Sequence, residues 1–181
     1  MNPDEYRQLQ AFARIDGLYL ALAWIVSFAC YIMGLSSPML CMLASVTAIA
    51  SPFFAGRRLT AFRDHVREGI ISFRRGAAYY FLIFFYASML FALAQYVYLA
   101  FLDHGYLVNT YLEVLSSDEA KTMFKAYGVT KRELNDMLAQ MQQITPVDFV
   151  LNVLVMNVLI GGLLCLPFAA WTRRRDNQPT L

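Results

Sequence analysis

Four long stretches of this 181-residue chain are nearly free of charge, and they constrain the fold more than any other feature. They cover residues 17–35, 38–55, 77–102 and 147–171, and the only charged residue in them is Asp148. A bilayer core about 30 Å thick needs about 20 apolar residues in a helix. Such segments must be helical because lipid offers the backbone no hydrogen-bond partner. We therefore predict an all-α membrane protein with four transmembrane helices in a single domain over residues 1–181.

The composition agrees with a membrane protein and argues against a nucleic-acid-binding protein. Charged residues make up 15% of the chain, against about 25% in an average soluble domain. The formal net charge of +2 is too small to suggest a nucleic-acid partner. Only Ser36 and Ser37 separate the first two apolar stretches, so we predict a tight helical hairpin there.

Eleven of the twelve arginines lie in three segments, and their distribution predicts the orientation. Cytoplasmic segments are enriched in Lys and Arg close to the span ends. With four spans, the N-terminal segment, the linker 56–76 and the C-terminal tail share one side. Their arginines are Arg7, Arg14, Arg57, Arg58, Arg63, Arg67, Arg74, Arg75, Arg173, Arg174 and Arg175. We predict that both termini are cytoplasmic and that the more acidic loop 103–146 is extracytoplasmic.

The linker 56–76 has the pattern of a basic amphipathic cytoplasmic helix. Its apolar residues recur every three or four positions, at Leu59, Phe62, Val66, Ile70 and Phe73. The flanking arginines, Arg57, Arg58, Arg63, Arg67, Arg74 and Arg75, are candidates for contact with anionic lipid headgroups or a partner. A plainer interpretation is that they set the topology while the stripe packs against other parts of the protein. Asp64 and Glu68 can also pair with arginines one turn away.

The loop 103–146 is too long for an idle connection and carries helix signals. Ser117 followed by two acids predicts one short helix, which Gly128 ends. Thr130 and Glu133 match a capping box and predict a second helix up to about residue 143. Thr145, a proline and Asp148 then predict the start of the fourth span. We expect a small helical cap whose methionine-bearing face packs on the bundle or docks a partner.

Few residues in the chain suggest chemistry. The main polar residues within the spans are Gln95, Asn152 and Asn157, which we interpret as helix–helix polar contacts, with a transport path as the alternative. The three cysteines form no metal or redox motif, and the two histidines have no second ligand at metal spacing, so we predict no metal and no cofactor. The neighbours Asp103 and His104 are the best candidates for a functional site or pH-sensitive position, and the plainer interpretation is a polar pair at the membrane interface.

Together, several segments resemble a domain-of-unknown-function family of small four-span inner-membrane proteins common in Bacteroidota. The matching features are the "GIISF" before the third span, Asp103 at the end of that span, and a helical insert containing YGVTKRELNDML before the last span. The resemblance implies a multi-pass location in the bacterial inner (cytoplasmic) membrane. It also implies that the gene lies near genes for lipid-linked glycosyltransferases, which is an association and gives no mechanism. It carries over no catalytic residues.

Three functional hypotheses follow. The first is a non-enzymatic accessory or scaffold subunit that binds another membrane protein, in connection with lipid-linked glycans. The second is a lipid or small-solute carrier that works as a homo-oligomer. The third is a membrane-bound enzyme, which would require Asp103 or His104 to be essential.

Overall fold

The computed structural model describes residues 3–35 and 38–174, most of which are helical. The helices are α1 (Pro3–Gly34), α2 (Pro38–Val66), α3 (Phe73–Phe101), α4 (Tyr106–Leu115), α5 (Asp118–Ala126), α6 (Lys131–Gln143) and α7 (Pro146–Thr172). Within these described ranges there is no strand, only an isolated bridge between Ile71 and Arg174. Helices α1, α2, α3 and α7 are long and apolar enough to cross a membrane, which confirms the all-helical class and gives one candidate span for each of the four predicted.

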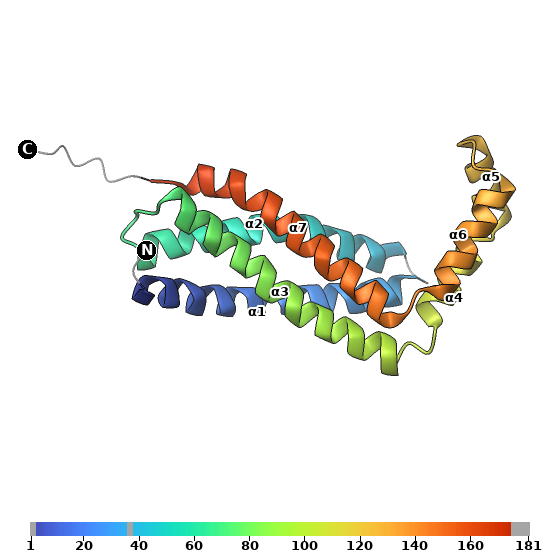
Figure 1. Ribbon diagram of the computed structural model, residues 1–181, viewed down its shortest axis with the longest axis horizontal. Coiled ribbons are helices and arrows are strands. Elements are labelled where there is room, and N and C mark those ends of the chain that lie inside the picture. Colours follow the sequence, from blue (N-terminus) through green and yellow to red (C-terminus); the bar gives the residue numbers. More distant parts are fainter. Residues whose placement is uncertain (1–2, 36–37, 175–181) are drawn as a thin grey trace, which may run out of the picture. The chain divides into compact units, whose positions relative to one another are not determined.

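The chain divides into two compact units. The first comprises Met1–Ala94 and Val153–Leu181, and the second comprises Gln95–Asn152. In the first unit, α1, α2 and the larger parts of α3 and α7 run side by side (Figure 1). The second unit holds the last turns of α3, the three short helices and the first turns of α7. The hairpin residues Ser36 and Ser37 and the tail residue Arg175 lie outside the described residues.

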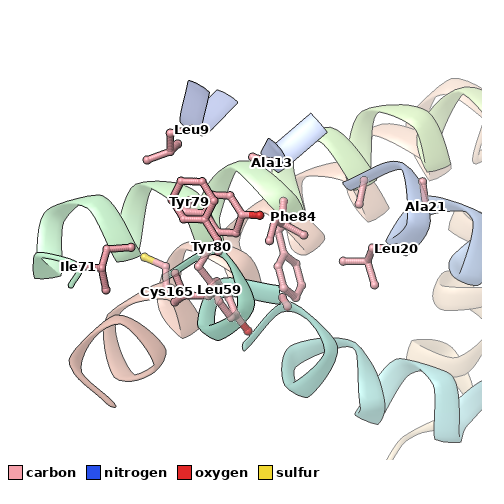
Figure 2. Packing of buried hydrophobic residues seen from close by; sticks show 14 of the residues in the cluster. Leu9, Ala13, Leu20, Ala21, Leu59, Ile71, Tyr79, Tyr80, Phe84 and Cys165 are labelled. Atoms are coloured by element: carbon pink, nitrogen blue, oxygen red, sulfur yellow. The ribbon is translucent and has the colours of Figure 1, made fainter. Parts of the chain in front are cut away.

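The core of the first unit is built from aromatic and small side chains. Figure 2 shows Tyr79 and Tyr80 of α3 among apolar side chains from the neighbouring helices, and both tyrosines are almost fully buried. Tyr79 stacks on Phe62 with ring centroids 4.3 Å apart, and Tyr80 stacks on Phe168 at 5.0 Å. Stacked aromatic pairs contribute about 0.5–1.5 kcal/mol beyond the area they bury. These contacts join α3 to α2 on one side and to α7 on the other.

Helix α2 continues past the predicted end of the second span. We expected a span over residues 38–55 and a separate linker helix over residues 56–76, but one helix runs from Pro38 to Val66. Gly56 lies inside this helix, and its missing side chain lets Phe168 pack closely against the backbone: a Cβ there would lie 2.6 Å from the ring of Phe168. The chain turns over residues 67–72 before α3 begins at Phe73.

The apolar stripe predicted in the linker faces the protein itself. Leu59 and Phe62 are buried, and Val66 packs against the same core. Ile70 lies beyond the end of α2 and is exposed, whereas its neighbour Ile71 is buried. The stripe is therefore part of the bundle core over its first three positions, and the plainer of the two sequence interpretations describes it.

The predicted helix signals of the loop 103–146 are present in the second unit. The Ser117 hydroxyl accepts a hydrogen bond from the backbone of α5, and Gly128 follows that helix with φ of 81°. Thr130 and Glu133 form the expected capping box at the start of α6. The hydroxyl of Thr145 accepts from the backbone N–H three residues later, at 3.2 Å, as α7 begins.

One helix of this unit, α4, was not predicted. The two residues before it have a left-handed backbone conformation, His104 with φ of 48° and Gly105 with φ of 82°. The buried carboxylate of Asp103 then accepts the backbone N–H of Leu107 at 3.2 Å. Asp103 therefore satisfies an open donor in the first turn of α4, which is the role a capping acid plays.

Candidate functional site

A crevice of about 300 Å³ lies among the four long helices, within the first unit. Its wall is largely aromatic, with Trp24, Phe28 and Tyr31 from α1 and Phe91 from α3. Phe91 meets Trp24 and Phe28 edge to face, with centroids 5.6 and 5.9 Å away, so this wall is well packed. The other lining residues are Ser27, Ala44, Ser45, Ala48, Val153 and Asn157.

Small residues explain why the space is open. Ala44 and Ala48 lie one turn apart on α2 and present little more than methyl groups to the crevice. The sequence predicts close helix packing from such spacing, but here the same residues leave room beside the aromatic wall. The lining positions on α1 and α2 lie in the half of the bundle nearest the α1–α2 hairpin.

Most polar groups of the crevice are satisfied by the protein. The Ser27 and Ser45 hydroxyls donate to backbone carbonyl oxygens of α2, at 3.2 and 2.9 Å. The Trp24 indole N–H donates to a serine hydroxyl of α2 at 2.7 Å. By contrast, the side chains of Asn157 and Tyr31 have no hydrogen-bond partner among the described residues. The crevice therefore combines an apolar surface with one amide and one phenol that remain available.

The three predicted span amides have different surroundings. Asn157 is half-buried and lines the crevice, whereas Asn152, five residues earlier on the same helix, is exposed. Gln95 is 3% exposed, and its Oε1 has no hydrogen-bond partner in the part of the chain that the structure describes. Their role as helix–helix contacts stays a prediction, and only Asn157 is brought to the crevice.

A second polar site in the first unit is centred on Asp16, which is 1% exposed. Its carboxylate accepts a hydrogen bond from Arg58 Nε at 2.7 Å, and Arg58 Nη2 lies 2.5 Å from the same oxygen. Its other oxygen accepts from the Tyr79 hydroxyl. This buried network links α1, α2 and α3 and neutralises a carboxylate that would be costly in apolar surroundings.

Three further arginines make contacts at the same end of the bundle. Glu5 of α1 accepts from Arg67 Nη2 at 3.2 Å and also from Arg75. Arg63 is buried and donates to Asp64, while its Nη1 donates to the Thr172 carbonyl oxygen at 3.0 Å. The end of α7 is thereby held to α2.

These contacts separate the six predicted headgroup or partner arginines into two groups. Arg58, Arg63, Arg67 and Arg75 bind carboxylates of the chain itself. Arg57 and Arg74 are exposed and have no ion-pair partner among residues 3–35 and 38–174. Contact with headgroups or a partner stays a prediction for the set, and it is best supported for these two.

Asp103 and His104 do not form a pair that suggests catalysis. Asp103 is 5% exposed and caps α4, whereas His104 is exposed and its Nδ1 lies 2.9 Å from the Leu102 carbonyl oxygen. The described residues include no group of three His, Cys, Asp or Glu side chains that could hold a metal ion. Cys30, Cys41 and Cys165 are free thiols.

The buried network around Asp16 was missed by the sequence analysis. Asp16 stands one residue before an apolar stretch, and Arg58 stands three residues after another. A tight hairpin brings these two positions to the same end of the bundle, so this signal was present in the sequence. The partner Tyr79 is 63 residues from Asp16 in sequence, and only the packing of α3 places it there.

Comparison with known proteins gives one family. A family model described as "Protein of unknown function (DUF4199)" matches residues 16–174, which include part or all of each candidate span. No curated protein and no solved structure matches the chain.

Proposed function

The chain belongs to the DUF4199 family of proteins of unknown function, and from its crevice we propose that it is a non-enzymatic integral membrane protein that holds a lipid chain between its helices. The ligand is a lipid with a long hydrocarbon chain and a hydrogen-bonding group. The protein acts as a carrier or receptor for this lipid in the bacterial inner membrane. Of the earlier hypotheses, the crevice favours the lipid carrier.

The observation that carries this proposal is the pair of unused polar side chains in an apolar space. An amide left without a hydrogen bond in apolar surroundings costs about 1–3 kcal/mol. A ligand that bonds to Asn157 or Tyr31 removes this cost while its chain covers the aromatic wall. A space of about 300 Å³ is at the lower end of small-molecule sites, so it fits a segment of a chain rather than a whole lipid.

The test compares two substitutions on one helix. Asn157→Leu removes the amide from the crevice, and Asn152→Leu removes an exposed amide five residues away. Each protein is purified in mild detergent, and its bound lipids are quantified by mass spectrometry after extraction. A lost hydrogen bond of about 0.5–1.5 kcal/mol predicts a two- to tenfold lower lipid occupancy for Asn157→Leu and no change for Asn152→Leu.

A third variant tests the space itself. Ala48→Phe places a ring in the crevice and should displace the lipid whatever group binds its polar end. A wild-type protein without a defined bound lipid would contradict the proposal. Equal occupancy in all three variants would contradict it as well.

A second candidate function is the accessory or scaffold subunit, in connection with lipid-linked glycans. The short helices of the second unit are not among the candidate membrane spans, yet Val114, Met123, Tyr127 and Met137 are between 45% and 81% exposed. Exposed apolar side chains outside the spans favour a protein partner. Mass spectrometry of the native preparation should then find a stoichiometric second protein, which Met123→Ser with Tyr127→Ser releases and which Asn152→Leu retains.

A further inference from the structure

A groove of about 900 Å³ lies along α5 and α6 in the second unit. Its apolar part consists of Phe124, Val129 and Leu134, of which Leu134 is buried. The rest of its lining is polar and is formed by Asp118, Lys121, Thr122, Lys125, Thr130, Lys131 and Asn135. The groove is separate from the crevice and shares no residue with it.

The charges of this lining are mainly positive. Lys121 lies 3.4 Å from Asp118, so these two largely balance each other. Lys125 and Lys131 form no ion pair with any described residue. The loop 103–146 has an excess of acidic residues, yet these two unpaired lysines line the same groove as the apolar residues. This arrangement suits a ligand with an anionic group next to an apolar chain.

The position of the groove favours a lipid over a soluble anion. The second unit contains the last turns of α3 and the first turns of α7, which are parts of two candidate spans. The chain between these spans therefore starts and ends at the membrane. Lysines near a membrane surface contribute about 1 kcal/mol each to contact with anionic lipids.

We propose that the groove between α5 and α6 binds an anionic phospholipid, with its phosphate at Lys125 and Lys131 and an acyl chain along Phe124, Val129 and Leu134. This site is independent of the proposed crevice ligand. It places the short helices against the bilayer surface through a specific lipid contact.

The test uses the full-length protein in nanodiscs that contain phosphatidylglycerol with a photoactivatable diazirine on the acyl chain. After illumination, crosslinks are mapped by mass spectrometry to peptides of α5 and α6. Diazirine phosphatidylcholine is the zwitterionic comparison. We expect crosslinks at the apolar lining with phosphatidylglycerol, and at least fivefold fewer with phosphatidylcholine.

The charge is then removed at two sites. Lys125→Gln with Lys131→Gln should lower the phosphatidylglycerol crosslinks at least fivefold, and Lys125→Gln alone should lower them less. Arg132 lies next to Lys131 on α6 but does not line the groove, so Arg132→Gln removes one charge and should leave the crosslinks unchanged. Crosslinks at the bundle serve as an internal reference for folding.

Three results would overturn the proposal. One is equal crosslinking of the two lipids at the groove, which indicates general contact with the bilayer. Another is an equal loss in Arg132→Gln, which indicates a diffuse charge effect. The third is complete competition by millimolar inorganic phosphate, which indicates a free-anion site.

Discussion

Substitutions in the buried network around Asp16 should destabilise the bundle unequally. The Asp16 side chain is 2% exposed, whereas the Arg58 side chain is 40% exposed. Arg58→Ala leaves a buried carboxylate without its counter-ion, which costs about 3–5 kcal/mol. Asp16→Ala instead leaves an arginine that can turn toward water and a buried Tyr79 hydroxyl that loses its acceptor, so the cost is about 1.5–3 kcal/mol. The arginine substitution should therefore be the more harmful of the two.

The assay is reversible unfolding in mixed detergent micelles with increasing SDS, followed by circular dichroism. Arg57→Ala is the matched control because Arg57 is the exposed neighbour of Arg58, and a surface substitution of this kind changes stability by about 0.5 kcal/mol or less. In the double variant Asp16→Ala with Arg58→Ala, the loss should be smaller than the sum of the single losses by about 1 kcal/mol or more. The reasoning is refuted if the losses add, or if Arg57→Ala costs as much as Arg58→Ala.

Three other predictions concern packing, capping and topology. Gly161→Ala should lower the stability of the bundle by about 1–3 kcal/mol because its Cβ would lie 2.5 Å from the side chain of Phe84. At Gly162 the nearest atom to an added Cβ is 3.9 Å away, so alanine should be tolerated there. Unfolding in SDS measures both effects. Hydrogen bonds donated by Thr130 lower the pKa of Glu133 in the folded state. The stability that Glu133 gives to α6 is therefore present above its unfolded pKa, about 4.3, and is lost as the pH falls through the lowered pKa. Circular dichroism of the wild type and of Glu133→Ala against pH should show this loss. A reporter fused after Leu181 should be active in the cytoplasm and one inserted near Gly128 outside it, and the reverse pattern would contradict the orientation.

The sequence predicted those features of the fold that depend on local chemistry. Uncharged runs predict spans because their burial in lipid needs no knowledge of neighbours. The caps at Ser117, Thr130 and Thr145 were predictable because each bond joins residues three positions apart. Helix α4 was missed because its first turn is capped by Asp103, an acid that the sequence analysis assigned to the end of a span.

The candidate sites depend on long-range packing and were therefore harder to predict from the sequence. The arginine-rich linker looked like a surface for lipid or a partner because its carboxylate partners Asp16 and Glu5 are 42 and 62 residues away from Arg58 and Arg67. Asn157 stood out as a polar residue within a span. The crevice beside it depends on which faces of four helices meet, and a single sequence does not specify this.

The contacts of α7 have a consequence for biosynthesis. Phe168 fills the space over Gly56, and the Thr172 carbonyl oxygen accepts from the buried Arg63. Both partners on α2 leave the ribosome more than 100 residues before Phe168 and Thr172 do. Until α7 is inserted, the nascent protein has an unfilled space over Gly56 and lacks one hydrogen-bond acceptor for Arg63, near the end of α2. We expect a chain truncated before α7 to be retained by insertion chaperones and then degraded by membrane proteases.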